Sequence, residues 1–174
     1  MNKLFVLVML LVFAVALSGC TQSSSQSGSP KANAGAAQAT IHKIGEKFSI
    51  GELSYTVNTI DKTEALGSEY LNKITEGMFY VVELTVENNS NSEKSITPSN
   101  DFVVTDEKGR QYKPSLELSL YAKTTGFEPL AAIEKLQPGI PKTGVIVFEM
   151  PKETKGTLKV KPSMFSGEAL VEFK

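Results

Sequence analysis

Residues 41–174 are predicted to fold as an all-β domain, an antiparallel β-sandwich of about seven to nine strands. Apolar and polar side chains alternate with a period of two in several short segments, turn residues separate these segments, and no sustained helical pattern intervenes. These features together are typical of two antiparallel sheets packed face to face. The domain is long enough to bury a core without disulfides, and none can form because Cys20 is the only cysteine.

The segment that precedes the domain begins like an export signal. A positive charge at Lys3 is followed by an unbroken apolar run over residues 4–17. As a helix this run would span about 21 Å, which is short of the ~30 Å hydrocarbon core of a membrane. We therefore predict that residues 1–19 are a signal peptide that is removed. An uncleaved N-terminal membrane helix is the alternative, and it also places the domain outside the cytoplasm.

The tetrapeptide Leu17-Ser18-Gly19-Cys20 resembles the lipobox of prokaryotic lipoprotein precursors. In that family the cysteine thiol is diacylated, and the peptide is cut immediately before the cysteine. The resemblance implies that Cys20 carries lipid and that the chain is anchored in the lipid bilayer of the cell membrane, facing the extracytoplasmic side. Two acyl chains make such an attachment stable, whereas one chain is marginal.

Residues 20–40 are predicted to be a flexible linker between the lipidated cysteine and the domain. They are rich in Ser, Ala and Gly and contain no large apolar side chain. Such a segment cannot bury enough surface to offset the entropy of ordering it. Its expected reach of roughly 25 Å would hold the domain clear of the lipid headgroups.

Three of the predicted strands are supported by their hydrophobic pattern. Residues 53–60 carry apolar side chains at alternate positions, and residues 78–87 do the same before they become more charged. A strand that starts in the core and then reaches solvent produces this change. Residues 143–150 are strongly apolar and stop at Pro151, which cannot donate to a sheet.

A β-hairpin is predicted where residues 102–105 and 110–113 flank a four-residue polar connection that ends in Gly109. This connection is typical of a type I turn followed by a bulge. Gln137-Pro138-Gly139 marks a further turn. Other strands are expected at residues 47–50, 95–97, 157–161 and 169–173.

Two segments break the period of two. Within residues 62–76, Leu66, Tyr70 and Ile74 are spaced four residues apart, and they would form one apolar stripe if the segment is helical. Residues 114–133 form a long connection with many apolar residues. A connection of this length is either functional or locally folded.

Three stretches of the sequence resemble a known prokaryotic family. They are Gly77-Met78-Phe79-Tyr80-Val81-Val82-Glu83-Leu84-Thr85-Val86-Glu87-Asn88-Asn89, Asp101-Phe102-Val103-Val104-Thr105-Asp106 with Gly109-Arg110-Gln111-Tyr112, and Leu136-Gln137-Pro138-Gly139 with Gly144-Val145-Ile146-Val147-Phe148-Glu149 and Pro151. The family is the lipoprotein-associated domain of unknown function 4352, which is grouped with extracellular immunoglobulin-like proteins such as the mycobacterial immunoprotective antigen. The resemblance covers about residues 41–160. It implies an immunoglobulin-like sandwich outside the cytoplasm, and it brings no catalytic residues with it.

The composition disfavours several classes of function. The formal net charge is −1 at pH 7, without the basic excess of a nucleic-acid-binding protein. His42 is the only histidine and lies at the edge of the linker, so nucleophilic catalysis and His/Cys metal sites lack their groups. A carboxylate pair for glycoside hydrolysis stays open, although sugar sites usually add a tryptophan, which is absent. We therefore expect no enzymatic activity, no cofactor and no nucleic-acid partner.

A calcium site at the predicted hairpin is an open alternative. Asn100, Asp101, Asp106 and Glu107 supply hard oxygen ligands near one another in the sequence. The simpler interpretation is that Asp106 and Glu107 are turn residues and that Asp101 is a surface residue at the start of a strand.

Two further motifs have both a functional and a structural interpretation. Lys152, Lys155, Lys159 and Lys161 either face an anionic surface or line the solvated face of an edge strand. Asn88-Asn89-Ser90 fits an N-glycosylation sequon, and a polar turn explains it equally well.

Binding of another envelope or extracellular protein is the function that the sequence favours. Small sandwich domains without catalytic groups commonly act through loops or exposed strand edges. The candidate anchors lie in the two irregular segments and are Leu66, Tyr70, Ile74, Leu116, Leu118, Tyr121 and Phe127. The same residues could instead cap the open ends of the sandwich. The alternative function is a lipoprotein that binds a small ligand or an ion and senses for, or delivers to, a membrane complex.

Overall fold

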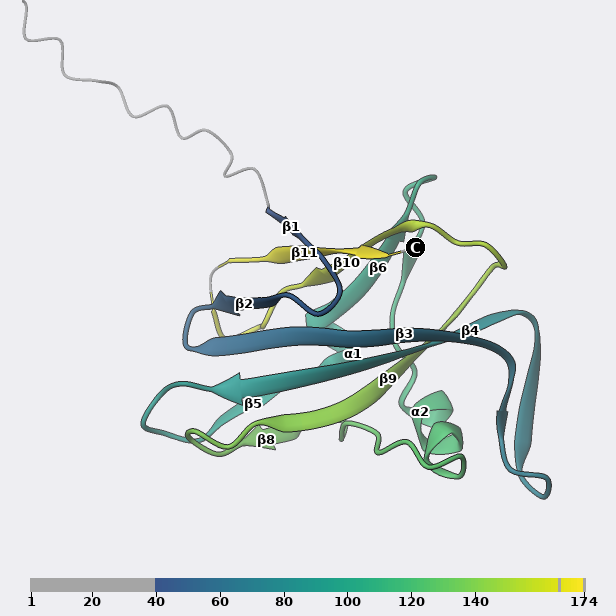
Figure 1. Ribbon diagram of the computed structural model, residues 1–174, viewed down its shortest axis with the longest axis horizontal. Coiled ribbons are helices and arrows are strands. Elements are labelled where there is room, and N and C mark those ends of the chain that lie inside the picture. The colour runs from purple at the N-terminus through teal and green to yellow at the C-terminus, as the bar shows by residue number, and fades with distance from the viewer. Residues whose placement is uncertain (1–39, 166, 174) are drawn as a thin grey trace, which may run out of the picture. The chain divides into compact units, whose positions relative to one another are not determined.

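The structure is a computed structural model that describes residues 40–165 and 167–173 of the 174-residue chain (Figure 1). The predicted signal peptide, the lipobox with Cys20 and linker residues 21–39 lie outside the described residues. No helix in the described part of the chain is long and apolar enough to cross a membrane.

The described residues form eleven strands and two short helices. In chain order these are β1 (Ile41–His42), β2 (Lys47–Ile50), β3 (Leu53–Gly67), β4 (Asn72–Asn88), β5 (Lys94–Ile96), α1 (Pro98–Asp101), β6 (Phe102–Asp106), β7 (Gln111–Tyr112), α2 (Leu116–Lys123), β8 (Glu134–Leu136), β9 (Lys142–Met150), β10 (Gly156–Val160) and β11 (Ala169–Phe173).

Two sheets make up the domain, and a third, two-stranded sheet joins β5 to β8. Sheet A has the strand order β1-β11-β10-β6-β7, and sheet B has the order β2-β3-β4-β9. All paired strands are antiparallel except β1 and β11, which run parallel. The predicted immunoglobulin-like antiparallel sandwich is confirmed. The strand count is higher than expected because β1 and β8 have two and three residues, too few to show a period.

The main core lies between the two sheets and is built by the alternating side chains of the predicted strands. Sheet B contributes Leu53, Tyr55, Val57, Tyr80, Val82, Leu84, Val86, Ile146, Phe148 and Met150, and sheet A contributes Phe102, Val104, Leu158, Val160, Ala169, Val171 and Phe173. The ring of Phe173 joins the sheets, because its centroid lies 5.3 Å from that of Tyr80 and 6.5 Å from that of Phe148.

The predicted hairpin at residues 102–113 is present as β6 and β7. The N–H of Asp106 donates to the carbonyl of Arg110, and the N–H of Gly109 donates to the carbonyl of Asp106. Gly109 has φ +76°, the left-handed conformation that the expected turn requires.

Residues 62–76 form no helix, so Leu66, Tyr70 and Ile74 do not form the apolar stripe that a helix would have given them. The segment is the distal part of a long hairpin, in which β3 continues to Gly67 and β4 begins at Asn72. Ser68 and Leu71 close the turn by donating their N–H groups to each other's carbonyls, at 2.9 and 3.2 Å. Gly67 adopts φ +107°, and a Cβ there would lie 2.0 Å from the Leu71 carbonyl oxygen. Only glycine can therefore occupy the start of this turn.

Part of this hairpin extends beyond the neighbouring strand. The pairing of β4 with β9 ends at Met78, opposite Met150, and beyond this point β3 and β4 pair only with each other. We name residues 64–77 the projecting hairpin. Figure 1 shows it as the ribbon that bends away from β9 at the right of the view.

The long connection at residues 114–133 is locally folded, as one of its two interpretations predicted. It contains α2, whose N-cap Ser115 accepts a hydrogen bond from the N–H of Leu118 at 3.3 Å. Leu118 and Ala122 pack on the outer face of sheet B in a second apolar cluster, together with Leu66, Phe79, Val81, Val145 and Val147. Because β9 is covered on both faces, its sequence is nearly continuously apolar.

Candidate partner-binding surface

The tip of the projecting hairpin carries three exposed apolar side chains. Tyr70 is 93% exposed, Ile74 is 71% exposed and Leu71 is 52% exposed. Two of these were predicted as anchors from the sequence. Leu71 was missed because it lies outside the four-residue spacing of the supposed helical stripe, and its only signal was its position beside Tyr70.

The structure brings the two irregular segments of the sequence together. Leu66 of β3 and Leu118 of α2 share the second apolar cluster, with exposures of 3% and 4%. The Nζ of Lys73 lies 3.1 Å from a carboxylate oxygen of Glu117, and this hydrogen bond and charge raise the pKa of Lys73. The projecting hairpin is therefore braced against the first turn of α2.

The seven predicted anchors consequently divide into two groups. Leu66 and Leu118 are buried, and Tyr121 and Phe127 pack partly buried against the same cluster, so these four hold α2 to the sheet. The residues that reach solvent are Tyr70, Ile74 and Leu116. Leu120, which was not among the predicted anchors, is also exposed on α2.

The carboxylates of the calcium alternative do not form one site. Asp101 ends α1 and Asp106 ends β6, so the length of this extended strand separates them by roughly 16 Å. Asp101 is 2% exposed, so the prediction that it is a surface residue was wrong. Asp101 accepts hydrogen bonds from Thr97 N and from the N–H and hydroxyl of Ser163. Glu107 is an exposed turn residue. Within the described residues no group of three or more His, Cys, Asp or Glu side chains could hold a metal ion.

Asp106 organises the β6–β7 turn. One carboxylate oxygen accepts from the N–H groups of Lys108 and Arg110, and the other accepts from Arg110 Nε at 2.7 Å and from the Tyr112 hydroxyl at 3.2 Å. Burial by itself would raise the pKa of Asp106, but the hydrogen bonds from Arg110 and Lys108 outweigh burial and lower it. Asp106 therefore has the role of a turn residue, as its simpler interpretation predicted.

The side chain of Asn88 is fully buried and serves as a structural bridge. Its amide nitrogen donates to the carbonyls of Ser92 and Leu136, at 2.8 and 2.9 Å. Its oxygen accepts from the N–H and the hydroxyl of Ser90. A glycan on this nitrogen is incompatible with the folded domain, so the sequon is explained by the turn that it builds.

The lysines of the C-terminal region do not protect a sheet edge, so that interpretation was wrong. β10 lies between β11 and β6 in the interior of sheet A. Lys159 pairs with Glu168 at 3.5 Å, and Lys152 pairs with Glu64.

His42, the only histidine, stabilises the start of the domain. Its Nδ1 lies 2.7 Å from Glu46 Oε1, and its ring stacks on Phe48 with the centroids 4.5 Å apart. These contacts use the ring for packing at the edge of sheet A.

Comparison with known proteins finds one family model that matches most of the domain. It is described as "Domain of unknown function (DUF4352)", and it matches residues 42–170. The uncharacterized protein YxkC of Bacillus subtilis is 28% identical over 138 residues, which cover 76% of this chain and 75% of that protein.

Two solved structures share the fold. The yjhA protein from Bacillus subtilis aligns with a TM-score of 0.57 and 23% identity, over 77% of this chain and all of that chain. MPT63, a secreted protein from Mycobacterium tuberculosis, aligns with a TM-score of 0.53 and 17% identity, over 79% of this chain and 99% of that chain. At these identities the likeness is one of fold.

Proposed function

This chain belongs to the family described as domain of unknown function 4352, and we propose that it is a non-catalytic binding module, anchored to the cell membrane on the extracytoplasmic side, that binds another envelope or extracellular protein. The family resemblance expected from the sequence is confirmed. A relationship to the mycobacterial immunoprotective antigen stays a prediction.

The observation that carries the proposal is the exposed apolar tip of the projecting hairpin. Tyr70, Leu71 and Ile74 remain largely exposed in the domain, although fully burying a side chain such as Leu or Ile is worth about 1.5–3 kcal/mol. Clustered exposed apolar residues, tyrosine among them, are typical of surfaces that bind proteins. The packing of Leu66 with Leu118 supports this interpretation, because a hairpin held in place loses less entropy on binding.

The chemistry of the described residues supports a role without catalysis. The only imidazole, His42, is bonded to Glu46 and stacked on Phe48. The carboxylates of Asp101 and Asp106 accept hydrogen bonds from neighbouring groups. An ion-binding role at this hairpin therefore has less support than it had from the sequence.

The location is supported by the lipobox resemblance of residues 17–20. Replacing Cys20 with alanine is expected to release the protein from membranes in detergent-free fractionation. Continued retention in the membrane fraction would contradict the lipid anchor and favour an uncleaved N-terminal helix.

The partner is sought by crosslinking the full-length chain in cells, purifying it through a C-terminal tag and identifying co-purifying proteins by mass spectrometry. The test variant combines Tyr70→Ser, Leu71→Ser and Ile74→Ser. The matched control combines Ile133→Ser and Ile140→Ser, which are 64% and 61% exposed. Ile140 lies just before the start of β9, at the other end of its pairing with β4.

A partner that co-purifies with the native chain and the control, and is lost from the folded test variant, is the expected result. Equal recovery with the test variant would show that the hairpin tip is not the binding surface. Absence of any partner at every crosslinker length would overturn the binding function itself.

A further inference from the structure

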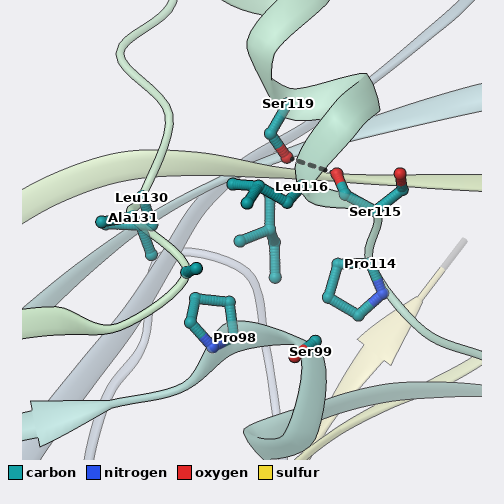
Figure 2. Close-up of a pocket in the computed structure, with 10 residues that line it drawn as sticks. Pro98, Ser99, Pro114, Ser115, Leu116, Ser119, Leu130 and Ala131 are labelled. Atoms are coloured by element: carbon teal, nitrogen blue, oxygen red, sulfur yellow. Dashed lines mark hydrogen bonds between the residues drawn. The ribbon is translucent and has the colours of Figure 1, made fainter.

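A pocket of about 140 Å³ opens beside the start of α2 (Figure 2). Its wall is formed by α1, by the start of α2, by residues 130–132 in the connection after α2, and by β9 of sheet B. The ten lining residues are Pro98, Ser99, Pro114, Ser115, Leu116, Ser119, Leu130, Ala131, Ala132 and Ile146.

The floor of the pocket belongs to the main core. Ile146 of β9 and Leu130 are 1% and 2% exposed and are members of the cluster between the sheets. Leu130 is fixed by a hydrogen bond from its N–H to the carbonyl of Val145 at 3.0 Å. It also packs where Gly144 has no side chain, since a Cβ there would lie 2.7 Å from Leu130 Cδ2. The floor is therefore rigid.

The buried polar atoms of the wall already have partners. The hydroxyl of Ser119 donates to the carbonyl of Ser115 at 2.9 Å and accepts from the N–H of Val147 at 3.2 Å. The hydroxyl oxygen of Ser115 accepts from the N–H of Leu118. None of the ten lining residues is charged. A polar or charged group that entered the pocket would lose water without full compensation, which restricts the occupant to apolar chemistry.

The volume sets the size of the occupant. An apolar protein cavity of roughly 150 Å³ is large enough for one benzene molecule. The mouth is formed in part by Ala131 and Ala132, which are small and exposed, and by Leu116, which is 45% exposed. A group of this size can therefore enter without opening the sandwich.

We propose that this pocket binds one small uncharged apolar group, a single aromatic ring or a branched aliphatic chain. The occupant is a free small molecule of this kind, because the pocket is small and its floor lies in the main core. A side chain of a polypeptide that lies over α2 is an outcome that the test distinguishes. This site is separate from the hairpin tip, so the proposal stands independently of the partner-binding function.

The test is a titration of the folded domain, with ¹³C-labelled Ile and Leu methyl groups, followed by NMR. Toluene and methylcyclohexane represent free molecules, and N-acetyl-leucinamide represents a partner's side chain. The expected result is a saturable shift of the Ile146 and Leu130 methyl signals, with intermolecular NOEs from the probe to Ile146. The Leu158 methyl groups, in the core on sheet A, serve as the internal control and are expected to stay in place.

The variant Ala131→Phe places a ring at the mouth, and it is expected to weaken binding of the probe by roughly tenfold or more, about 1.4 kcal/mol. Its matched control is Ala65→Phe, an exposed alanine on the projecting hairpin, which should bind like the native chain. Binding of toluene or methylcyclohexane alone assigns the pocket to free molecules, and binding that includes N-acetyl-leucinamide assigns it to a side chain. Non-saturating shifts spread over all methyl groups, or equal binding by Ala131→Phe, would show that the pocket is only a gap in the packing.

Discussion

The backbone N–H of Thr154 donates a hydrogen bond of 2.9 Å to the hydroxyl of Tyr80 in the middle of sheet B. The same hydroxyl donates to the carbonyl of Pro151 at 3.3 Å. Tyr80 is fully buried, and Thr154 is 6% exposed. The Tyr80 hydroxyl thus binds the connection between β9 of sheet B and β10 of sheet A to strand β4. This connection joins the two sheets.

Tyr80→Phe should destabilise the domain without changing its fold. Removing the hydroxyl leaves the N–H of Thr154 buried and unpaired, which costs about 1–3 kcal/mol. The free energy of unfolding, measured by urea denaturation, is expected to fall by this amount with an unchanged slope against urea concentration. An unchanged midpoint would show that water replaces the lost partner.

At neutral pH, Tyr55→Phe should not lower the free energy of unfolding, in contrast to Tyr80→Phe. The Tyr55 hydroxyl is buried and has no hydrogen-bond partner among the described residues. Its ring lies between Phe48 and Phe102, with centroid distances of 5.8 and 6.2 Å, and phenylalanine can keep these contacts. In the same urea experiment, the free energy of unfolding of the variant is expected to equal that of the native chain or to exceed it by about 1 kcal/mol. A loss as large as that of Tyr80→Phe would reveal a hidden partner of the hydroxyl.

The same residue predicts an alkaline weakening of the fold. Burial, aided by the negative charge of Asp101, raises the pKa of Tyr55 above its ordinary value. Above about pH 10 the phenol ionises in the unfolded chain but stays protonated in the folded one, so stability is present below this pH and lost as the pH rises. Between pH 9 and about pH 11 the native chain should lose stability more steeply than Tyr55→Phe. If the free energy of unfolding fell equally with pH in the two proteins, the raised pKa of Tyr55 would be contradicted.

Asp106→Asn should remove an acid-dependent part of the stability. The hydrogen bonds from Arg110 lower the pKa of Asp106 despite its burial, so the contribution of the carboxylate is present above about pH 4 and lost as the pH falls further. At pH 7 the variant should melt at a lower temperature than the native chain, and the difference should shrink toward about pH 2. Glu107→Gln, in the exposed part of the same turn, is the control and should melt like the native chain. A difference that stays constant with pH would exclude the ionised carboxylate as its cause.

Asn88→Asp tests the buried amide bridge with an isosteric change. A carboxylate cannot donate to the carbonyls of Ser92 and Leu136, and it would place negative charge against both. We expect a loss of roughly 2–4 kcal/mol in the free energy of unfolding. Asn91→Asp, exposed in the same loop, should stay within about 0.5 kcal/mol of the native chain. Equal effects of the two changes would show that the bridge does not stabilise the fold.

Strands that bury one face were predictable because burial imposes the period of two. Residues 53–57 and 157–161 show this alternation, and their apolar side chains lie in the core. Residues 143–150 were recognisable because Pro151 ends an apolar run. The β6–β7 turn was predictable because its polar sequence ends in the glycine that the backbone requires.

The projecting hairpin was not predictable in the same way. Leu66 is the one buried side chain of residues 64–77, so no apolar alternation appears in the sequence, and the spacing of Leu66, Tyr70 and Ile74 matched a helix by coincidence. The signal against a helix was Gly67, because glycine suits the start of a tight turn. The pocket beside α2 was also hidden, because it joins residues from four separate parts of the chain.

If residues 20–40 form the predicted linker, the short strand β1 is the first element that would carry a mechanical load on it. A pull on Thr40 would reach the fold through two residues, Ile41 and His42, which are held by parallel pairing to β11. Detaching them and the turn that follows would release residues 41–46 and lengthen the tether by roughly 20 Å. The load would then meet β2, where Phe48 and Ile50 are anchored in the core. Under load, β1 would therefore detach from β11 and pair with it again afterwards, while the two sheets stay packed together.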